Sequence, residues 1–275
     1  MVAGGGSGGS GGGGGLSRLS LLRNSLLVPA VLPLLLEGYS RAPPLQPESL
    51  PPLLLEGTST PRDLVIVLPG SGGPDANTAR ILAALRPKAE VIEYDWRRFK
   101  GDELRAPYNA QRIGAELGRA LARRADQPRS VHLVGISAGA FLADAIASSY
   151  AAAASPNRAH LHLTLCDAFT ARGLAGLARP ATAWGVRNFG RSADYCEALL
   201  NTDDPVPSTA TPLRHAATFD LTDAAARRAF VPLPGDSLHS WPAAWYGLVG
   251  ARTRPERPYH GAGGLPPRGA VVGVA

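Results

Sequence analysis

Short apolar runs alternate with amphipathic segments through the middle of this chain, and this alternation limits the fold more than any other feature of the sequence. The first run, 64–68, is apolar throughout, which is typical of a strand that is covered on both faces. Three similar runs follow, at 91–95, 131–136 and 161–165. Strands in strict alternation with helices predict an α/β fold with a mainly parallel sheet and helices on both faces.

Helix signals lie between these runs. Asn77 is the expected N-cap of a helix that carries apolar residues on one side. Over 109–125, apolar residues recur every four positions and predict an amphipathic helix that ends before Pro128. Another helix is expected over 138–150. Beyond Asp167 the signal weakens, and the further strands expected there are 195–200 and 216–221.

The two ends of the chain differ in composition from its middle. Residues 1–57 combine a glycine tract, an Arg- and Leu-rich stretch and a Pro-rich lead-in. The apolar run 26–36 is too short and too interrupted by proline to span a bilayer. Its layout resembles a secretory or organelle-targeting peptide, and a structural lead-in fits it equally. We expect one folded, function-bearing domain over 58–249 and a disordered tail over 250–275.

Charge and cysteine content exclude some classes of function. The net charge is +6, but the basic residues are nearly all arginines and are scattered along the chain. Nucleic acid is therefore not an expected partner. Cys166 and Cys196 fit no metal-ligand spacing, so two buried thiols are expected. A disulfide between them would require neighbouring strands with suitable geometry.

The motif that carries most chemical information is Gly135-Ile136-Ser137-Ala138-Gly139, a G-x-S-x-G between an expected strand and an expected helix. In such a turn the backbone passes so close that neither glycine can be replaced by a residue with a Cβ. The turn exposes the Ser137 hydroxyl as a nucleophile and points the amide of Ala138 at a developing oxyanion. The alternative is a glycine-rich strand end without catalytic function.

A serine nucleophile requires a base, and the chain has six histidines. Three lie in or beside expected strands and one lies in the tail, which leaves His215 and His239. His239 is favoured because it lies in a late loop, consistent with the chain order serine, acid, histidine. A surface-loop histidine is the alternative interpretation of either residue.

The expected acid is Asp167, which directly follows the strand over 161–165, at the carboxyl edge of the sheet. Asp194, Asp203 and Asp204 compete with it for this role. Asp144 is expected on the helix after Ser137 and facing solvent.

A second oxyanion donor is expected from the glycine-rich loop after the first strand, where the amides of Gly70 and Ser71 can approach a ligand closely. A phosphate-binding loop is the rival interpretation, but no Gly-Lys-Ser/Thr follows. Neither a metal nor an organic cofactor is expected.

Several segments resemble, in order and spacing, the lipase family related to pancreatic lipase, within the α/β-hydrolase superfamily. Pro69-Gly70 stands where that family usually has His-Gly, and no disulfide-bonded lid is recognisable. The segments that carry the resemblance are Tyr94-Asp95-Trp96, Tyr108-Asn109-Ala110, His132 to Ala140, Leu165-Cys166-Asp167-Ala168 and Leu238-His239-Ser240.

The resemblance implies an α/β-hydrolase fold and a serine carboxylic-ester hydrolase of the lipase or esterase type. Ser137 would be the nucleophile, Asp167 the acid and His239 the base. The expected partner is a small-molecule or lipid ester, together with peripheral contact at a lipid interface. An acyltransferase and a non-catalytic binding protein of the same fold are the alternatives.

Overall fold

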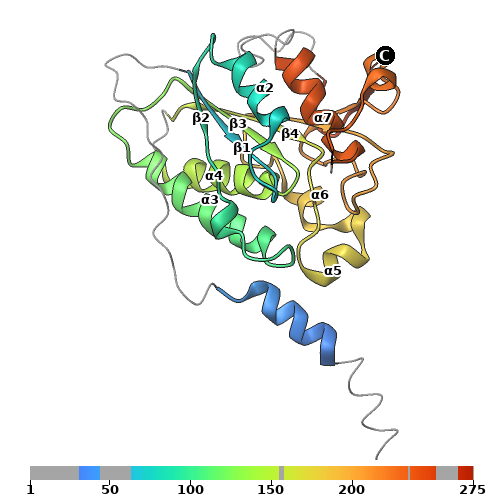
Figure 1. Ribbon diagram of the computed structural model, residues 1–275. Helices are drawn as coiled ribbons and strands as arrows, with labels where there is room; N and C mark the ends of the chain where they lie inside the picture. The colour runs from blue at the N-terminus through green and yellow to red at the C-terminus, as the bar shows by residue number, and fades with distance from the viewer. Residues whose placement is uncertain (1–30, 44–62, 155–157, 235, 252–265, 275) are drawn as a thin grey trace, which may run out of the picture.

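The computed structural model describes residues 31–43, 63–154, 158–234, 236–251 and 266–274 (Figure 1). In this part of the chain seven strands form an all-parallel sheet in the order β2-β1-β3-β4-β5-β6-β7. The strands are β1 (Asp63–Leu68), β2 (Glu90–Glu93), β3 (Ser130–Ile136), β4 (His160–Cys166), β5 (Tyr195–Leu200), β6 (Ala217–Asp220) and β7 (Val271–Gly273). The α-helices between and after them are α2 (Ala76–Leu85), α3 (Ala106–Ala122), α4 (Gly139–Ala153), α5 (Gly173–Ala178), α6 (Trp184–Asn188) and α7 (Trp241–Trp245).

Helices cover both faces of this sheet, as the alternating sequence predicts. Helices α3 and α4 pack on one face, and α2 and α7 on the other (Figure 1). Side chains of a strand alternate between faces, so Ile66 of β1 joins the core under α3 and α4, whereas Val65 and Val67 join the core under α2 and α7. The α/β class is confirmed.

The strand order reverses at β1, and this reversal determines where a site can form. From β1 the chain places β2 on one side and β3 on the other, and Leu68 at the end of β1 pairs with Gly135 near the end of β3. The loops that leave these two strands diverge to opposite faces of the sheet and open a crevice at its carboxyl edge. The glycine loop after β1 and Ser137 after β3 both lie at this crevice.

Helices α3 and α4 approach each other closely because α3 carries two glycines at the contact. A Cβ on Gly114 would lie 2.6 Å from the carbonyl oxygen of Leu142, and one on Gly118 would overlap the carbonyl oxygen of Ile146. Since α4 starts directly after Ser137, this contact also fixes the helix that supports the turn.

The predicted cap of α2 was wrong. Asp75 is the N-cap: its carboxylate accepts from the amide of Thr78 at 2.7 Å, and Thr78 closes a capping box with the backbone of Asp75. Asn77 lies within the first turn and is buried. Aspartate and asparagine are both favoured at N-cap positions. What marks Asp75 as the cap is Thr78, three residues later, which completes the capping box.

Asp144 was expected to face solvent, and this was wrong. It is buried on α4 and accepts a hydrogen bond from the amide of Gly190 at 3.0 Å. Burial raises the pKa of its carboxyl to about 7. The segment around Gly190 covers this side of α4, and nothing in the local sequence of the helix indicates that cover.

Cys166 and Cys196 are both buried thiols, and neither forms a disulfide. Their strands β4 and β5 are neighbours, but Cys166 pairs with Leu199 and Cys196 pairs with Leu163. The two thiols are therefore offset along the sheet, and the expectation of two buried thiols is confirmed.

The ends of the chain contribute more structure than the sequence predicts. A helix covers 31–41, inside the segment expected to be low in complexity. Strand β7, in the tail expected to be disordered, pairs with β6 through Thr218 and Val271. Most of the predicted targeting and linker segment, and residues 252–265 of the tail, lie outside the described residues. None of the helices described is both long and apolar enough to cross a bilayer.

Replacing Gly118 by alanine should destabilise the protein by about 1–3 kcal/mol, because the new methyl group overlaps the backbone of α4. The matched control is Gly38→Ala, a helical glycine with open space around it, which should leave the free energy of unfolding unchanged or slightly higher. Urea unfolding of both variants measures the difference. Equal stability of the two would contradict close packing of α3 on α4.

Candidate functional site

The backbone at Ser137 is left-handed, with φ of +52°, at the point where β3 ends and α4 begins. Residues other than glycine rarely adopt this conformation, and it costs on the order of 1–2 kcal/mol. Backbone hydrogen bonds hold it: the Ser137 amide donates to Cys166 at 3.0 Å, and the Ser137 carbonyl accepts from Ala140 at 3.1 Å and from Phe169 at 3.2 Å. The turn is thus imposed by the sheet and helix that it joins.

Glycine is required on both sides of this turn. A Cβ on Gly135 would lie 2.9 Å from the Cα of Ala140, and one on Gly139 would overlap the carbonyl oxygen of Leu68. The close backbone approach predicted from the G-x-S-x-G pattern is confirmed. It brings the start of α4 against the end of β1, next to the glycine loop.

Ser137 faces an apolar cavity of about 440 Å³ at the carboxyl edge of the sheet. Ser71 and Ala138 line the cavity beside it. Its walls are mainly apolar and include Leu104, Pro107, Phe169, Leu177 and Val206. The serine hydroxyl therefore meets a space that suits an apolar group of a ligand.

The loop after β1 lies against Ser137. A Cβ on Gly70 would be 3.3 Å from the Cβ of Ser137, so the two residues are in contact. The buried indole of Trp96 donates to the Pro69 carbonyl at 2.8 Å and fixes the loop. Within the described residues, the amides of Gly70, Ser71 and Ala138 donate no hydrogen bond to protein groups, so they can receive a negatively charged oxygen.

His239 lies between two carboxylates. It sits in a short 3₁₀ helix, Leu238–Ser240, and its Nδ1 is 2.7 Å from Oδ2 of Asp204 and 3.3 Å from Oδ2 of Asp167. The structure thus brings together His239 and Asp167, which are far apart in sequence. It places Asp204, named from the sequence only as a competitor, closer to the ring.

Each carboxylate is held by other groups as well. Asp204, in the turn after β5, accepts from the Thr209 hydroxyl at 2.6 Å and from the Val206 amide at 2.9 Å. Asp167, at the end of β4, accepts from the amide of Asn201 at 3.3 Å, and the side chain of Asn201 donates to the carbonyl of Leu238. Asn201 therefore connects the end of β5 to the loop that carries His239.

The three side chains shift one another's pKa. Burial raises the pKa of Asp167 to about 7, and the neighbouring Asp204 adds to the rise. Burial opposes ionisation of Asp204 too, but hydrogen bonds from His239, Thr209 and Val206 outweigh it and lower its pKa. For His239, burial favours the neutral ring, yet the hydrogen bonds and charges of both aspartates prevail and raise its pKa to about 9. Asp204 is therefore the more fully ionised partner of the ring.

These three residues also form a set of potential metal ligands, since their donor atoms lie within 4.8 Å of one another. The 2.7 Å between Nδ1 and the Asp204 oxygen is the length of a hydrogen bond. Two atoms that ligate one zinc-sized ion at about 2.1 Å each are roughly 3 Å or more apart. The observed spacing fits a hydrogen-bonded group better than a metal centre.

Ser137 and His239 share one edge of the sheet without a direct bond. Ser137 is hydrogen-bonded to Cys166, the residue before Asp167, and Asp167 contacts His239. Among the described residues no hydrogen bond joins the Ser137 hydroxyl to the imidazole. Catalytic hydrogen bonds are often long in the absence of substrate, so both groups remain candidates.

The other sequence candidates lie elsewhere. Asp194 precedes β5, at the opposite edge of the sheet, and pairs with Arg158. Asp203 pairs with Arg227, and the ring of His215 lies 3.1 Å from the carbonyl of Arg187.

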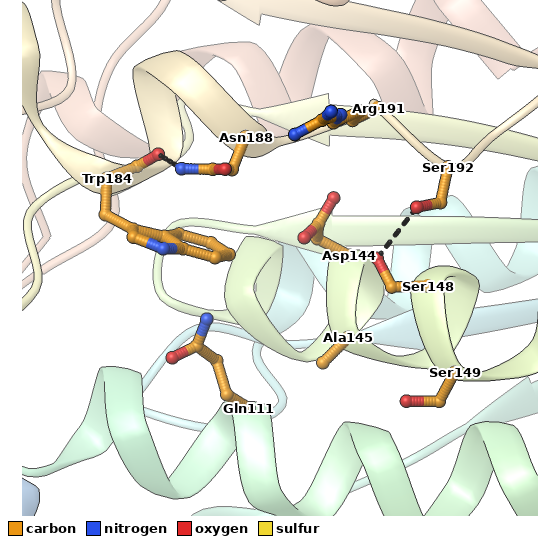
Figure 2. Close-up of a pocket in the computed structure, with 9 residues that line it drawn as sticks. All are labelled: Gln111, Asp144, Ala145, Ser148, Ser149, Trp184, Asn188, Arg191 and Ser192. Atoms are coloured by element: carbon orange, nitrogen blue, oxygen red, sulfur yellow. Dashed lines mark hydrogen bonds between the residues drawn. The ribbon is translucent and has the colours of Figure 1, made fainter. Parts of the chain in front are cut away.

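A second, smaller hollow of about 230 Å³ lies between α3, α4 and α6 (Figure 2). Several of its polar groups are hydrogen-bonded to protein. The Ser148 hydroxyl donates to Ser192 at 3.2 Å, and the Asn188 amide donates to the carbonyl of Trp184 at 2.7 Å. The Asp144 carboxylate, which also lines the hollow, accepts the hydrogen bond from the Gly190 amide. The bonds of Ser148 and Asp144 join α4 to the segment after α6.

Comparison with protein-family models finds no match to this chain, and comparison with curated proteins finds none either. The fold and the geometry of the site are therefore the observations on which a function can be argued.

The strain at Ser137 can be measured without any assumption about activity. Ser137→Gly should be more stable than Ser137→Ala by about 1 kcal/mol, because both lack the hydroxyl and only glycine tolerates φ of +52°. Ala138→Gly is the control: that residue has a helical φ of −63°, so glycine there should destabilise by about 0.5–1 kcal/mol. Denaturant unfolding gives both differences. A Ser137→Gly variant less stable than Ser137→Ala would show that the turn is not strained.

Proposed function

We propose that this protein is a serine hydrolase of the α/β-hydrolase fold that cleaves carboxylic esters through an acyl-enzyme on Ser137. The observation that carries the proposal is the strained Ser137 turn at the sheet's reversal point, facing an apolar cavity, with an imidazole held by carboxylates at the same edge. A strained nucleophile between strand and helix is the arrangement this chemistry requires.

The reaction begins with attack of the Ser137 oxygen on the ester carbonyl carbon while Nε2 of His239 takes the hydroxyl proton. The negative oxygen of the tetrahedral intermediate is held by the amides of Ala138 and of the Gly70–Ser71 loop. When the intermediate collapses, His239 returns its proton to the departing alcohol. Water then attacks the acyl-enzyme by the same steps and releases the acid.

We assign orientation of the imidazole mainly to Asp204. It is the closer carboxylate to Nδ1, at 2.7 Å against 3.3 Å for Asp167, and the one whose pKa is lowered. An ionised partner at Nδ1 keeps Nε2 free to accept a proton and stabilises the imidazolium that forms. Asp167, with its raised pKa, adds a second and weaker hold on the ring.

The apolar cavity next to Ser137 favours an ester with an apolar acyl group, lipid esters included. An acyltransferase would form the same acyl-enzyme, and product analysis with an added alcohol acceptor separates transfer from hydrolysis.

A fluorophosphonate probe should label the purified protein at Ser137, and Ser137→Ala should abolish labelling and lower ester hydrolysis by about 10⁶-fold. The matched control is Ser71→Ala, a serine on the same cavity whose proposed contribution is a backbone amide that the variant retains. It should label like the wild type. Labelling that persists in Ser137→Ala would refute the assignment, and a non-catalytic protein would label at neither position.

The pH dependence of kcat/KM should report His239. The ring must be neutral to accept a proton, and its pKa is raised to about 9, so activity should rise with pH along a limb above pH 6.5 and favour alkaline conditions. Asp204→Asn removes the charge that raises this pKa. It should shift the limb to lower pH and reduce kcat by about 10⁴-fold.

The control for this experiment is Asp203→Asn, because the Asp203 carboxylate is half exposed and pairs with Arg227. It should leave the limb in place. Asp167→Asn should cost less activity than Asp204→Asn. A larger loss for Asp167→Asn would return the principal role to Asp167.

A further inference from the structure

The helix over 31–41 exposes a continuous apolar surface. Leu34 is 72% exposed and Leu35 is 63% exposed. The other exposed apolar residues of its first half are Val31, Leu32 and Leu36. Single exposed leucines are common on soluble proteins, but contiguous ones mark a surface that contacts something apolar.

The second half of the same helix is fixed to the domain by polar contacts. The Glu37 carboxylate accepts from the amide of Leu174 at 2.8 Å and from the Tyr108 hydroxyl at 3.2 Å. The Tyr39 hydroxyl donates to Asp102. Arg105 donates to the carbonyl of Ala42 at 2.9 Å, just past the helix. The apolar half therefore projects from an anchored base.

The anchor points belong to the segments that line the Ser137 cavity. Tyr108 follows Pro107 at the start of α3, and Leu174 lies on α5 between two cavity-lining residues, Gly173 and Leu177. Leu177, which lines the cavity, is itself exposed. The projecting helix thus stands beside the side chains that surround Ser137.

The surroundings of the helix are basic. Arg41 lies on it, is exposed and pairs with Glu37 at 2.7 Å, and three further arginines lie close to its second half. Glu37 and Asp102 are the acidic residues that contact this half. The three neighbouring arginines are Arg105 and Arg112, which donate to backbone carbonyls at the helix end, and Arg172, which interacts with Glu37 and Arg41. An apolar helix with a basic flank complements an anionic lipid surface.

We propose that the helix over 31–41 docks the protein onto the surface of an anionic lipid bilayer, its apolar half entering the interface beside the Ser137 cavity. The docking stands on these exposed residues, whereas the delivery of a lipid ester to Ser137 rests on the proposed function.

The distribution of the apolar side chains favours lipid over a second protein. Successive helical residues are about 100° apart, so the exposed apolar residues at 31, 32, 34, 35 and 36 cover an arc of roughly 200° around the axis. A helix that docks in a protein groove needs an apolar stripe only about 100° wide, whereas fluid acyl chains at an interface can cover a wider arc.

Co-sedimentation of the full-length protein with vesicles tests the proposal, using phosphatidylcholine alone and phosphatidylcholine mixed with phosphatidylglycerol. The protein should bind the mixed vesicles more tightly, and added salt should weaken binding. The double variant Leu34→Ser/Leu35→Ser should lower the partition coefficient at least about tenfold, since two leucines leave the interface. The control is Val231→Ser/Leu248→Ser, which changes two exposed apolar residues outside the helix and should bind like the wild type.

Two further measurements separate the possible failures. Ser137→Ala should bind vesicles normally, and Leu34→Ser/Leu35→Ser should keep full turnover of a soluble short-chain ester. Unchanged vesicle binding by the leucine variant, or none by the wild type, would overturn the docking while leaving the proposed function intact. A dimer in gel filtration that the leucine variant disrupts would identify a second copy, rather than lipid, as the occupant.

Discussion

The left-handed backbone at Ser137 is the constraint on which the rest of the site depends. It is unfavourable by itself and persists because Cys166 of β4 holds its amide, while Ala140 of α4 and Phe169 after β4 hold its carbonyl. Those elements can approach so closely only because Gly135 and Gly139 lack a Cβ. The same glycines press the start of α4 against the end of β1, so the serine, the amide after it and the glycine loop meet at one place.

Burial strongly affects the charge states of Asp167, Asp204 and His239. Two aspartates and one histidine lie in contact with little water around them, and such a group cannot carry two negative charges without compensation. The shifts in pKa divide the roles accordingly: Asp204 stays ionised, Asp167 holds its proton more tightly, and the ring becomes more basic. A base with a raised pKa gains proton affinity but is neutral less often at pH 7, which links the proposed chemistry to alkaline conditions.

The architecture also relates the candidate site to the outer surface. The segment before α3 and the helix α5 line the cavity on one side and anchor the helix over 31–41 on the other. The exposed apolar helix and the apolar cavity are therefore connected by the same two pieces of chain.

Local sequence determined the parts of this protein that depend on neighbours along the chain. The alternation of apolar runs and amphipathic segments was sufficient for the parallel sheet with covered faces, because strand and helix periodicities are properties of consecutive residues. The Ser137 turn was predictable for the same reason, since its two glycines and its flanking elements are adjacent in sequence.

What depended on distant contacts was decided only by the tertiary structure. No local pattern distinguishes Asp204 from Asp167 as the closer partner of His239, because the choice follows from where the loops after β4 and β5 end. The burial of Asp144, the pairing of β7 with β6 and the anchoring of the helix over 31–41 likewise arise from segments remote in sequence. Each of these contacts forms between two segments that are distant along the chain. The local sequence of one segment therefore does not reveal which other segment will pack against it.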